Sequence, residues 1–239
     1  MILQSASAAL GHLFSAPFRG VFIKTLGLTL LVLAVLWFGL KEVVEWLALP
    51  WLSSLMPSMP DWAGWIGLFA AIAAGIGLAL ALAFLIAPVT AIVASLFLDD
   101  VAELVERNDY PSDPPGRPVP LIAGIVLSLK FFGVVILGNI LALFLLLIPG
   151  VNIAAFFVVN GYLLGREFFE FAAMRFRPED EAKALRRRFA GTIFLAGLLI
   201  AAFMAVPLLN LLTPLFACAM MVHLHKAIAA RDLREAARR

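Results

Sequence analysis

The sequence predicts an all-α integral membrane protein, with two long transmembrane helices plus two partly inserted, re-entrant helical hairpins. First, 63% of the 239 residues are hydrophobic and 14% are charged, whereas an average soluble domain has about 45–50% and 25%. Second, long runs without any charged residue are interrupted by prolines. Third, Lys and Arg gather in the segments between those runs. A water-soluble fold could not bury this many apolar side chains, so the excess must face lipid.

Two stretches, residues 21–40 and 62–87, have the length of full transmembrane spans, since about 20 apolar residues cross roughly 30 Å of hydrocarbon. Between them lies a polar return with three prolines, and five tryptophans flank it as interfacial anchors do: Trp37, Trp46, Trp51, Trp62 and Trp65. The second span is predicted to end at Pro88, because proline removes a backbone donor and clashes with the preceding helical turn. Residues 1–16 carry apolar side chains at helical spacing and are predicted to form an interfacial helix.

Two further apolar runs, residues 131–165 and 189–222, are predicted to form helical hairpins that insert only partly. Each run is too long for one simple span and contains proline near its middle, at Pro149 in the first and at Pro207 in the second. The arms on either side have 15 to 18 residues. Such arms barely reach across about 30 Å of hydrocarbon, or fall short of it.

The distribution of Lys and Arg predicts the orientation of these elements. Residues 166–188 hold seven Lys and Arg, and residues 223–239 hold five. Short cytoplasmic loops collect such residues, so both segments are predicted to be cytoplasmic. Each hairpin then enters and leaves the membrane by the same face, and both termini are cytoplasmic. Residues 1–239 are predicted to form a single membrane domain.

The residue types that usually carry catalysis do not form any catalytic pattern in this sequence. No catalytic or nucleotide-binding motif occurs, so we expect neither enzymatic activity nor an organic cofactor. His223 and His225 are two residues apart and would point to different faces of a helix, so no metal site is expected. Cys218 is the single cysteine, which excludes an internal disulfide and a paired-thiolate site. The net charge of +2 does not indicate a nucleic-acid partner.

A candidate anion-binding stretch precedes the first span, in the sequence SAPFRG. Pro17 suits the first turn of a helix, so the backbone N–H groups of Phe18, Arg19 and Gly20 would be unpaired donors beside the Arg19 guanidinium. Together with Lys24 one turn later, they would form a cradle for a tetrahedral oxyanion. The alternative is that Arg19 and Lys24 are ordinary cytoplasmic anchors of the span.

Four polar residues in or near the hairpins are candidates for an ion pathway: Lys130, Asn139, Asn160 and Asn210. Polar groups at membrane depth are costly, and broken helices near a bend are how transporters build ion sites. The alternative is structural, with Lys130 as a snorkelling anchor and the amides satisfying backbone groups that proline frees. Gly161 and Gly165 form a GxxxG pattern in the same region, which would let a neighbouring helix approach closely.

Several motifs, in this order, resemble those of the CysZ-type sulfate permeases, which are related to the etoposide-induced proteins: SAPFRG, MPDWAGW, IAPVTAIVASLFLDDVAELVE, IPGVN and AVPLLNLLTPLFACAMMVHLHK. The resemblance implies an oligomeric protein of the bacterial inner membrane that admits sulfate for cysteine biosynthesis. It also implies an anion site at Pro17 to Gly20. This sequence departs from the family there, because a single Arg19 stands where relatives tend to have two adjacent arginines.

We therefore expect a permease for sulfate or a related oxyanion, acting as a homo-oligomer in the lipid bilayer. Without a Walker motif, ATP is not its direct energy source, and both a channel and a coupled transporter remain open. The alternative is a non-transporting membrane scaffold or lipid-organising protein whose hairpins act as wedges. A lipid-modifying enzyme is a third candidate, for which the sequence offers no nucleophile and base.

Overall fold

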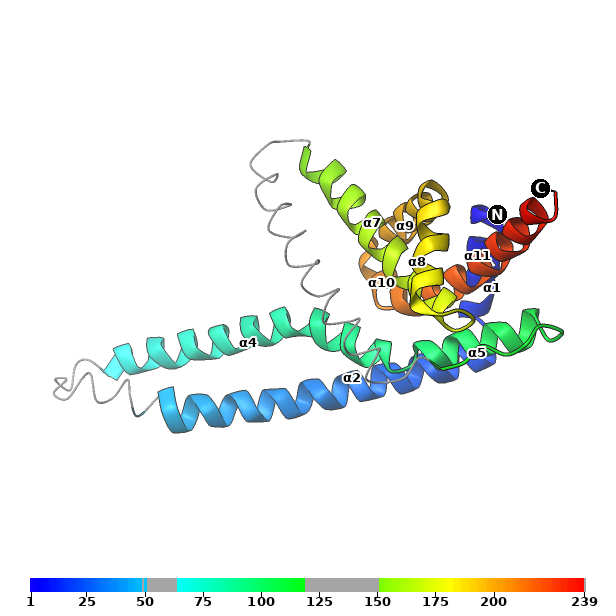
Figure 1. The fold of residues 1–239 in the computed structure, drawn as a ribbon. Helices are drawn as coiled ribbons and strands as arrows, with labels where there is room; N and C mark the ends of the chain where they lie inside the picture. Colours follow the sequence, from blue (N-terminus) through cyan, green and yellow to red (C-terminus); the bar gives the residue numbers. More distant parts are fainter. Residues whose placement is uncertain (49, 51–63, 119–150, 239) are drawn as a thin grey trace. The chain divides into compact units, whose positions relative to one another are not determined.

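The computed structural model of the protein describes residues 1–48, 50, 64–118 and 151–238. Within these ranges every regular element is helical, as Figure 1 shows. The predicted all-α class is therefore confirmed. Two of the described helices, Ala16–Trp46 and Thr213–Ala236, are long and apolar enough to cross a membrane, and one bent helix pair could add a third span.

The chain divides into two compact units. The first comprises Met1–Phe22 and Leu96–Arg239, and the second comprises Ile23–Ser95. Helix α2 (Ala16–Val43) begins in the first unit and continues in the second, where a π-helical turn, η1 (Val44–Ala48), extends it. The second unit also contains α4 (Gly64–Ser95).

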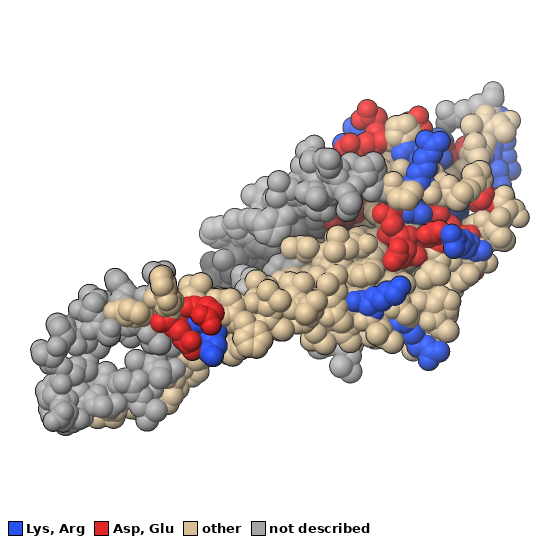
Figure 2. Space-filling view, turned by 90° about the horizontal axis from the view of Figure 1, so that it is seen from below, with Lys and Arg blue, Asp and Glu red and all other residues tan. Residues whose placement is uncertain are grey.

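Helix α2 contains the first predicted span and extends it at both ends. Only 17% of its most apolar stretch is buried within the protein. Large side chains along it are exposed, among them Ile23, Leu31 and Phe38. Figure 2 shows charged side chains in separate groups, with broad uncharged surface between them. A helix that carries so many bare apolar side chains is suited to hydrocarbon.

Helix α4 corrects the predicted end of the second span. We expected the helix to break at Pro88, but α4 runs through Pro88 to Ser95. A proline removes one backbone hydrogen bond, whereas unwinding an apolar segment exposes many polar backbone groups that lipid cannot satisfy. The continuous helix is therefore the less costly arrangement. Residues 62 and 63 of the predicted span lie outside the described residues.

Helix α11 (Thr213–Ala236) is the central helix of the first unit. It packs against α1 (Ile2–Leu13), α5 (Leu98–Asp109), α7 (Val151–Met174) and α9 (Ala190–Met204). Its side chains are buried continuously from Leu215 to His225. Helix α11 is continuous across residues 222 and 223, where we predicted that the second hairpin ends and the basic cytoplasmic segment begins. Packing on several neighbours keeps this part of the helix regular.

Helix α1 confirms the helical spacing predicted for the N-terminal segment. Ser5, Ala6, Ala9 and Leu13 are buried on one face of α1, which packs against α11. A second apolar set is exposed, with Leu3 and Leu10 on α1 and Phe14 directly after it. One apolar stripe of the helix is therefore used for packing, while the other suits the predicted membrane interface.

The second predicted hairpin is bent at the proline, as expected. Helix α9 ends at Met204, a short helix α10 (Pro207–Asn210) starts at Pro207, and α11 follows. With 15 residues, α9 is about 22 Å long, shorter than the roughly 30 Å hydrocarbon core. A second bend of 90° separates α9 from α8 (Glu179–Arg188). The first hairpin's bend at Pro149 lies outside the described residues.

Helices α7 and α9 approach each other through glycine. A Cβ built on Gly165 would lie 2.7 Å from the carbonyl oxygen of Ile193, and one built on Gly197 would overlap the carbonyl oxygen of Gly161. Only glycine, which has no side chain, fits between backbones this close. The predicted close approach at Gly161 and Gly165 is confirmed, with Gly197 as the partner across the interface.

Candidate functional site

The predicted anion-binding stretch lies at the start of α2, and Pro17 stands in its first turn as expected. The backbone differs from the expectation at Arg19, whose N–H group donates a hydrogen bond to the carbonyl of Ser15 at 3.0 Å. Helical hydrogen bonding therefore already starts from Ser15, so the Arg19 N–H is not a free donor. The predicted set of three unpaired donors is wrong at this residue.

The side chains of this stretch point in two directions. Phe18 is buried, and its ring stacks on His12 with a centroid separation of 5.4 Å. The other residues are exposed: Pro17, Arg19, Gly20 and Lys24. Neither cation forms an ion pair with any part of the chain that the structure describes. Arg19 and Lys24 are thus available cations on α2, and their role in anion binding stays a prediction.

The structure gives a local explanation for one of the predicted pathway residues. The Asn160 side chain donates from Nδ2 to the carbonyl of Phe156 at 2.8 Å, one helical turn back. Asn210 is exposed at the end of α10. No hydrogen bond among the described residues joins either amide to Arg19. Lys130 and Asn139 lie outside the described residues.

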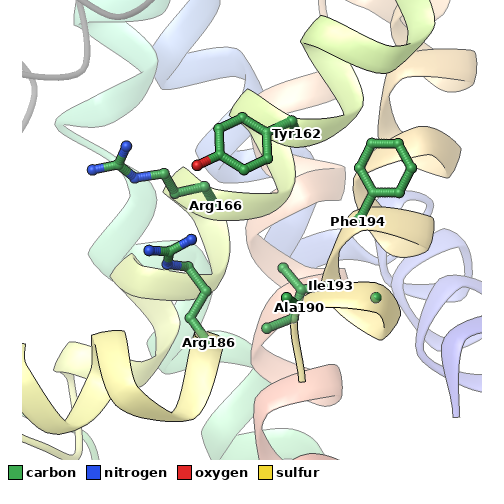
Figure 3. A pocket seen from close by; sticks show the side chains of 7 residues that line it. Tyr162, Arg166, Arg186, Ala190, Ile193 and Phe194 are labelled. Atoms are coloured by element: carbon green, nitrogen blue, oxygen red, sulfur yellow. The ribbon is translucent and has the colours of Figure 1, made fainter. Parts of the chain in front are cut away.

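A pocket that sequence reasoning missed lies between α7, α8 and α9. Its volume is about 280 Å³, well above the roughly 30 Å³ that one water occupies in the liquid. Its lining comprises Tyr162, Arg166, Arg186, Ala190, Gly191, Ile193 and Phe194. Figure 3 shows both guanidinium groups and the Tyr162 hydroxyl on the same side of the pocket. Helix α8 packs against α7, and this packing places Arg186 beside Arg166 and Glu170 of α7.

A single buried carboxylate holds the two arginines of the pocket. Glu170 Oε1 lies 2.6 Å from Arg186 Nε and 3.4 Å from Arg166 Nε. The Glu170 side chain is only 3% exposed, whereas those of Arg166 and Arg186 are 31% and 17% exposed. Each guanidinium has five N–H donors in a fork, so one carboxylate cannot use them all. The remaining donors can serve an incoming anion.

A second carboxyl group on α7, that of Glu167, follows Arg166 directly in the chain. Burial, and then the neighbouring charge of Glu170, raise the pKa of Glu167 to about 8. Near pH 7 most Glu167 carboxyls therefore keep their proton. Two guanidinium charges then face one carboxylate charge, and the local excess is positive. Such a site favours an anion.

The sequence contained a signal for this pocket. Arg166 directly follows the first predicted hairpin, residues 131–165, and Arg186 stands shortly before the second, residues 189–222. We interpreted both as part of a general cytoplasmic positive charge. Because each basic residue borders a predicted hairpin, the two cations could also have been predicted to meet if the predicted hairpins packed together.

Another buried ionic network connects α5, α7 and the segment after α5. Arg175 donates from Nε and Nη2 to the two carboxylate oxygens of Glu106, at 2.7 and 3.1 Å, and from Nη1 to Asp99. The backbone N–H of Gly116 donates to Glu106 Oε2 at 3.0 Å. Every polar group of this fork has a partner, as buried ion pairs require. The network fixes the segment after α5 against α7.

The two C-terminal histidines point to different surroundings, as predicted. His225 is stacked on Phe176 with a centroid separation of 5.3 Å and meets the edge of Phe169 at 6.0 Å. His223 instead faces Asp109, with 3.4 Å between Nε2 and the nearer carboxylate oxygen. The two histidines therefore do not share a ligand.

Comparison with known proteins identifies the family. A family model described as sulfate transporter CysZ/etoposide-induced protein 2.4 matches residues 5–214. No individual curated protein matches the chain. The matched range extends from α1 to the beginning of α11, and it includes both the basic stretch of α2 and the pocket between α7, α8 and α9. The chain is thus a multi-pass membrane protein that belongs to the sulfate transporter CysZ/etoposide-induced protein 2.4 family.

Proposed function

We propose that this protein is a permease that carries sulfate, or a closely related oxyanion, across the bacterial inner membrane to supply cysteine biosynthesis. Family membership supports the transport of sulfate. The observation that carries the proposal is the pocket between α7, α8 and α9, in which Arg166 and Arg186 both contact the Glu170 carboxylate. A permease of this kind needs no covalent chemistry.

The pocket has the chemistry that an oxyanion requires. A guanidinium fork matches the oxygen spacing of a tetrahedral oxyanion, and charge-assisted hydrogen bonds are roughly twice as strong as neutral ones. The Tyr162 hydroxyl adds a donor, and the apolar side chains of Ile193 and Phe194 lower the local dielectric constant. The anion competes with Glu170 for the two arginines, so it is held and can also be released.

The exposed cations of α2 are proposed to act at an earlier step. Arg19 and Lys24 lack ion-pair partners among the described residues, so they can attract an anion by their charge. Attraction by exposed charges is weakened by salt, whereas binding between partly buried arginines is much less affected. The salt dependence of sulfate uptake should therefore differ between variants at Arg19 and variants at Arg186.

Homo-oligomers, with both termini cytoplasmic, are part of the proposal. Helix α9 falls short of the hydrocarbon thickness, and association of chains reduces the cost of such a mismatch. Chemical cross-linking of the detergent-solubilised protein should give discrete oligomers over a range of concentrations. A monomer at every concentration would contradict the oligomer and leave the pocket argument intact.

Uptake of labelled sulfate into proteoliposomes tests the function. Vesicles that contain the purified protein should take up sulfate at a saturable rate above that of protein-free vesicles. Unlabelled sulfate should compete, and chloride at the same ionic strength should compete far less, because a single spherical ion lacks the paired oxygens that match a guanidinium fork. A folded, inserted protein without flux, tested with and without a pH gradient, would favour the non-transporting scaffold.

A further inference from the structure

Three side chains from distant parts of the chain meet at one point in the first unit. They are His12 from α1, Asp109 from the end of α5 and His223 from α11. One ligand atom from each residue lies within 4.8 Å of the other two. His12 Nε2 is 2.5 Å from Asp109 Oδ2, and His223 Nε2 is 3.4 Å from the same oxygen.

Neighbouring groups hold both imidazole rings in place. His12 stacks between Phe18 and His223, with centroid separations of 5.4 and 5.7 Å. The Tyr110 hydroxyl lies 2.9 Å from Nδ1 of His223, which leaves Nε2 as the atom that faces Asp109. Histidines that bind metals almost always have such a partner on the other ring nitrogen, which fixes the tautomer and the ring orientation.

One ring nitrogen of His223, Nε2, is buried without a hydrogen-bond partner among the described residues. His223 is only 6% exposed, and its Nε2 has no hydrogen-bond partner of good geometry among the described residues. Leaving a buried polar atom unsatisfied costs about 1–3 kcal/mol. If Nδ1–H donates to the Tyr110 oxygen, the lone pair of Nε2 points toward the space beside Asp109 and His12. A cation there would satisfy it.

We propose that His12 Nε2, a carboxylate oxygen of Asp109 and His223 Nε2 bind a divalent transition metal of the zinc class. Two imidazoles and one carboxylate form a donor set typical of zinc, and unlike the all-oxygen sets of magnesium and calcium. Ligand atoms about 2.0–2.1 Å from a tetrahedral zinc lie roughly 3.4 Å apart. The His223–Asp109 distance already has this value, and His12 has to withdraw by about 1 Å.

The site also has a structural consequence. The sequence pattern argued against a metal because His223 and His225 cannot share one, but the fold pairs His223 with His12 instead. A metal at this point would connect the N-terminal helix α1 to α5 and α11. It would therefore stabilise the docking of α1, independently of anion transport.

Metal content of the untagged, full-length protein in detergent tests the proposal. The protein is stripped with a chelator, incubated with micromolar Zn²⁺, desalted and measured by mass spectrometry. We expect about one zinc per chain, and the Co²⁺ form should show the visible absorption of a tetrahedral complex. His12→Gln and Asp109→Asn should each lose at least tenfold in zinc affinity, and Tyr110→Phe should keep one site with roughly tenfold weaker affinity.

A matched carboxylate variant is the control. Glu103→Gln removes an exposed carboxylate from the same helix, α5, and should bind zinc as the wild type does. Thermal unfolding adds an independent readout, since Zn²⁺ should raise Tm of the wild type and not of Asp109→Asn. Less than a fifth of a zinc per wild-type chain, or equal zinc in wild type and both ligand variants, would overturn the proposal.

Discussion

Replacing Gly197 by alanine should force α7 and α9 apart. The new methyl group would overlap the carbonyl oxygen of Gly161 and lie 2.8 Å from the backbone nitrogen of Gly165. Ordinary contact begins at 3.4 Å, and both neighbours belong to a helix backbone, so no side-chain rotation relieves the overlap. The helices themselves have to move.

The expected loss in the free energy of unfolding of Gly197→Ala is the difference between two opposing effects. Overpacking costs about 1–3 kcal/mol, and the upper part of this range, about 2–3 kcal/mol, applies here because the overlapped atoms are backbone atoms. Alanine in place of glycine favours a helix by about 1 kcal/mol. A net loss of about 1–2 kcal/mol corresponds to a decrease in Tm of roughly 2–8 °C for a chain of this size. Gly161→Ala should cost less, because the nearest atom to its methyl group, at 2.7 Å, is the end of the Leu198 side chain.

Thermal unfolding of the detergent-solubilised variants measures this effect. Gly11→Ala is the control, since a methyl group there meets nothing within 4 Å and should leave Tm equal or slightly higher. An unchanged or raised Tm for Gly197→Ala would refute the close packing of α7 against α9. It would also remove the basis for the pocket, which these two helices line.

Two further predictions concern ionisable side chains, one on α7 and one directly after it. Folding raises the pKa of Glu167 from 4.5 to about 8, so the folded protein binds this proton more tightly than the unfolded chain does. The stabilisation that the bound proton gives is complete below about pH 4.5 and is lost as the pH rises to about 8. Wild-type Tm should therefore fall over this window, and Glu167→Gln should flatten the curve; a parallel decline in the variant would contradict the assignment. Arg175→Met leaves Glu106 buried without its partner and should cost about 3–5 kcal/mol, measured as a lower Tm, while a loss below about 1 kcal/mol would show that water reaches this carboxylate.

Much of the architecture could be predicted because it depends on local patterns. Hydropathy identified the span in α2, proline placed the bend at Pro207, and the spacing of Gly161 and Gly165 indicated a close helix contact. The predicted helix end at Pro88 was wrong, because α4 continues through this residue. Whether a helix breaks at a proline depends on whether the freed backbone groups would meet water or lipid, and the sequence around the proline does not show this.

The candidate sites were harder to predict because they depend on long-range packing. Arg166 and Arg186 look like ordinary cytoplasmic charges in the sequence, and only the packing of α8 on α7 makes them neighbours. His12 and His223 come from opposite ends of the chain, and α1 has to dock on α11 before they meet. Spacing along one helix cannot reveal such pairs.

The initial rate of sulfate uptake by proteoliposomes containing Arg186→Gln tests the central claim most directly. Arg187→Gln is the matched control, because it removes the same charge from the exposed side of the same helix, α8. We predict that Arg186→Gln loses at least tenfold in uptake at low sulfate concentration, while Arg187→Gln keeps the wild-type rate. Equal, wild-type rates for both folded variants would contradict the assignment of the α7–α8–α9 pocket to the oxyanion path.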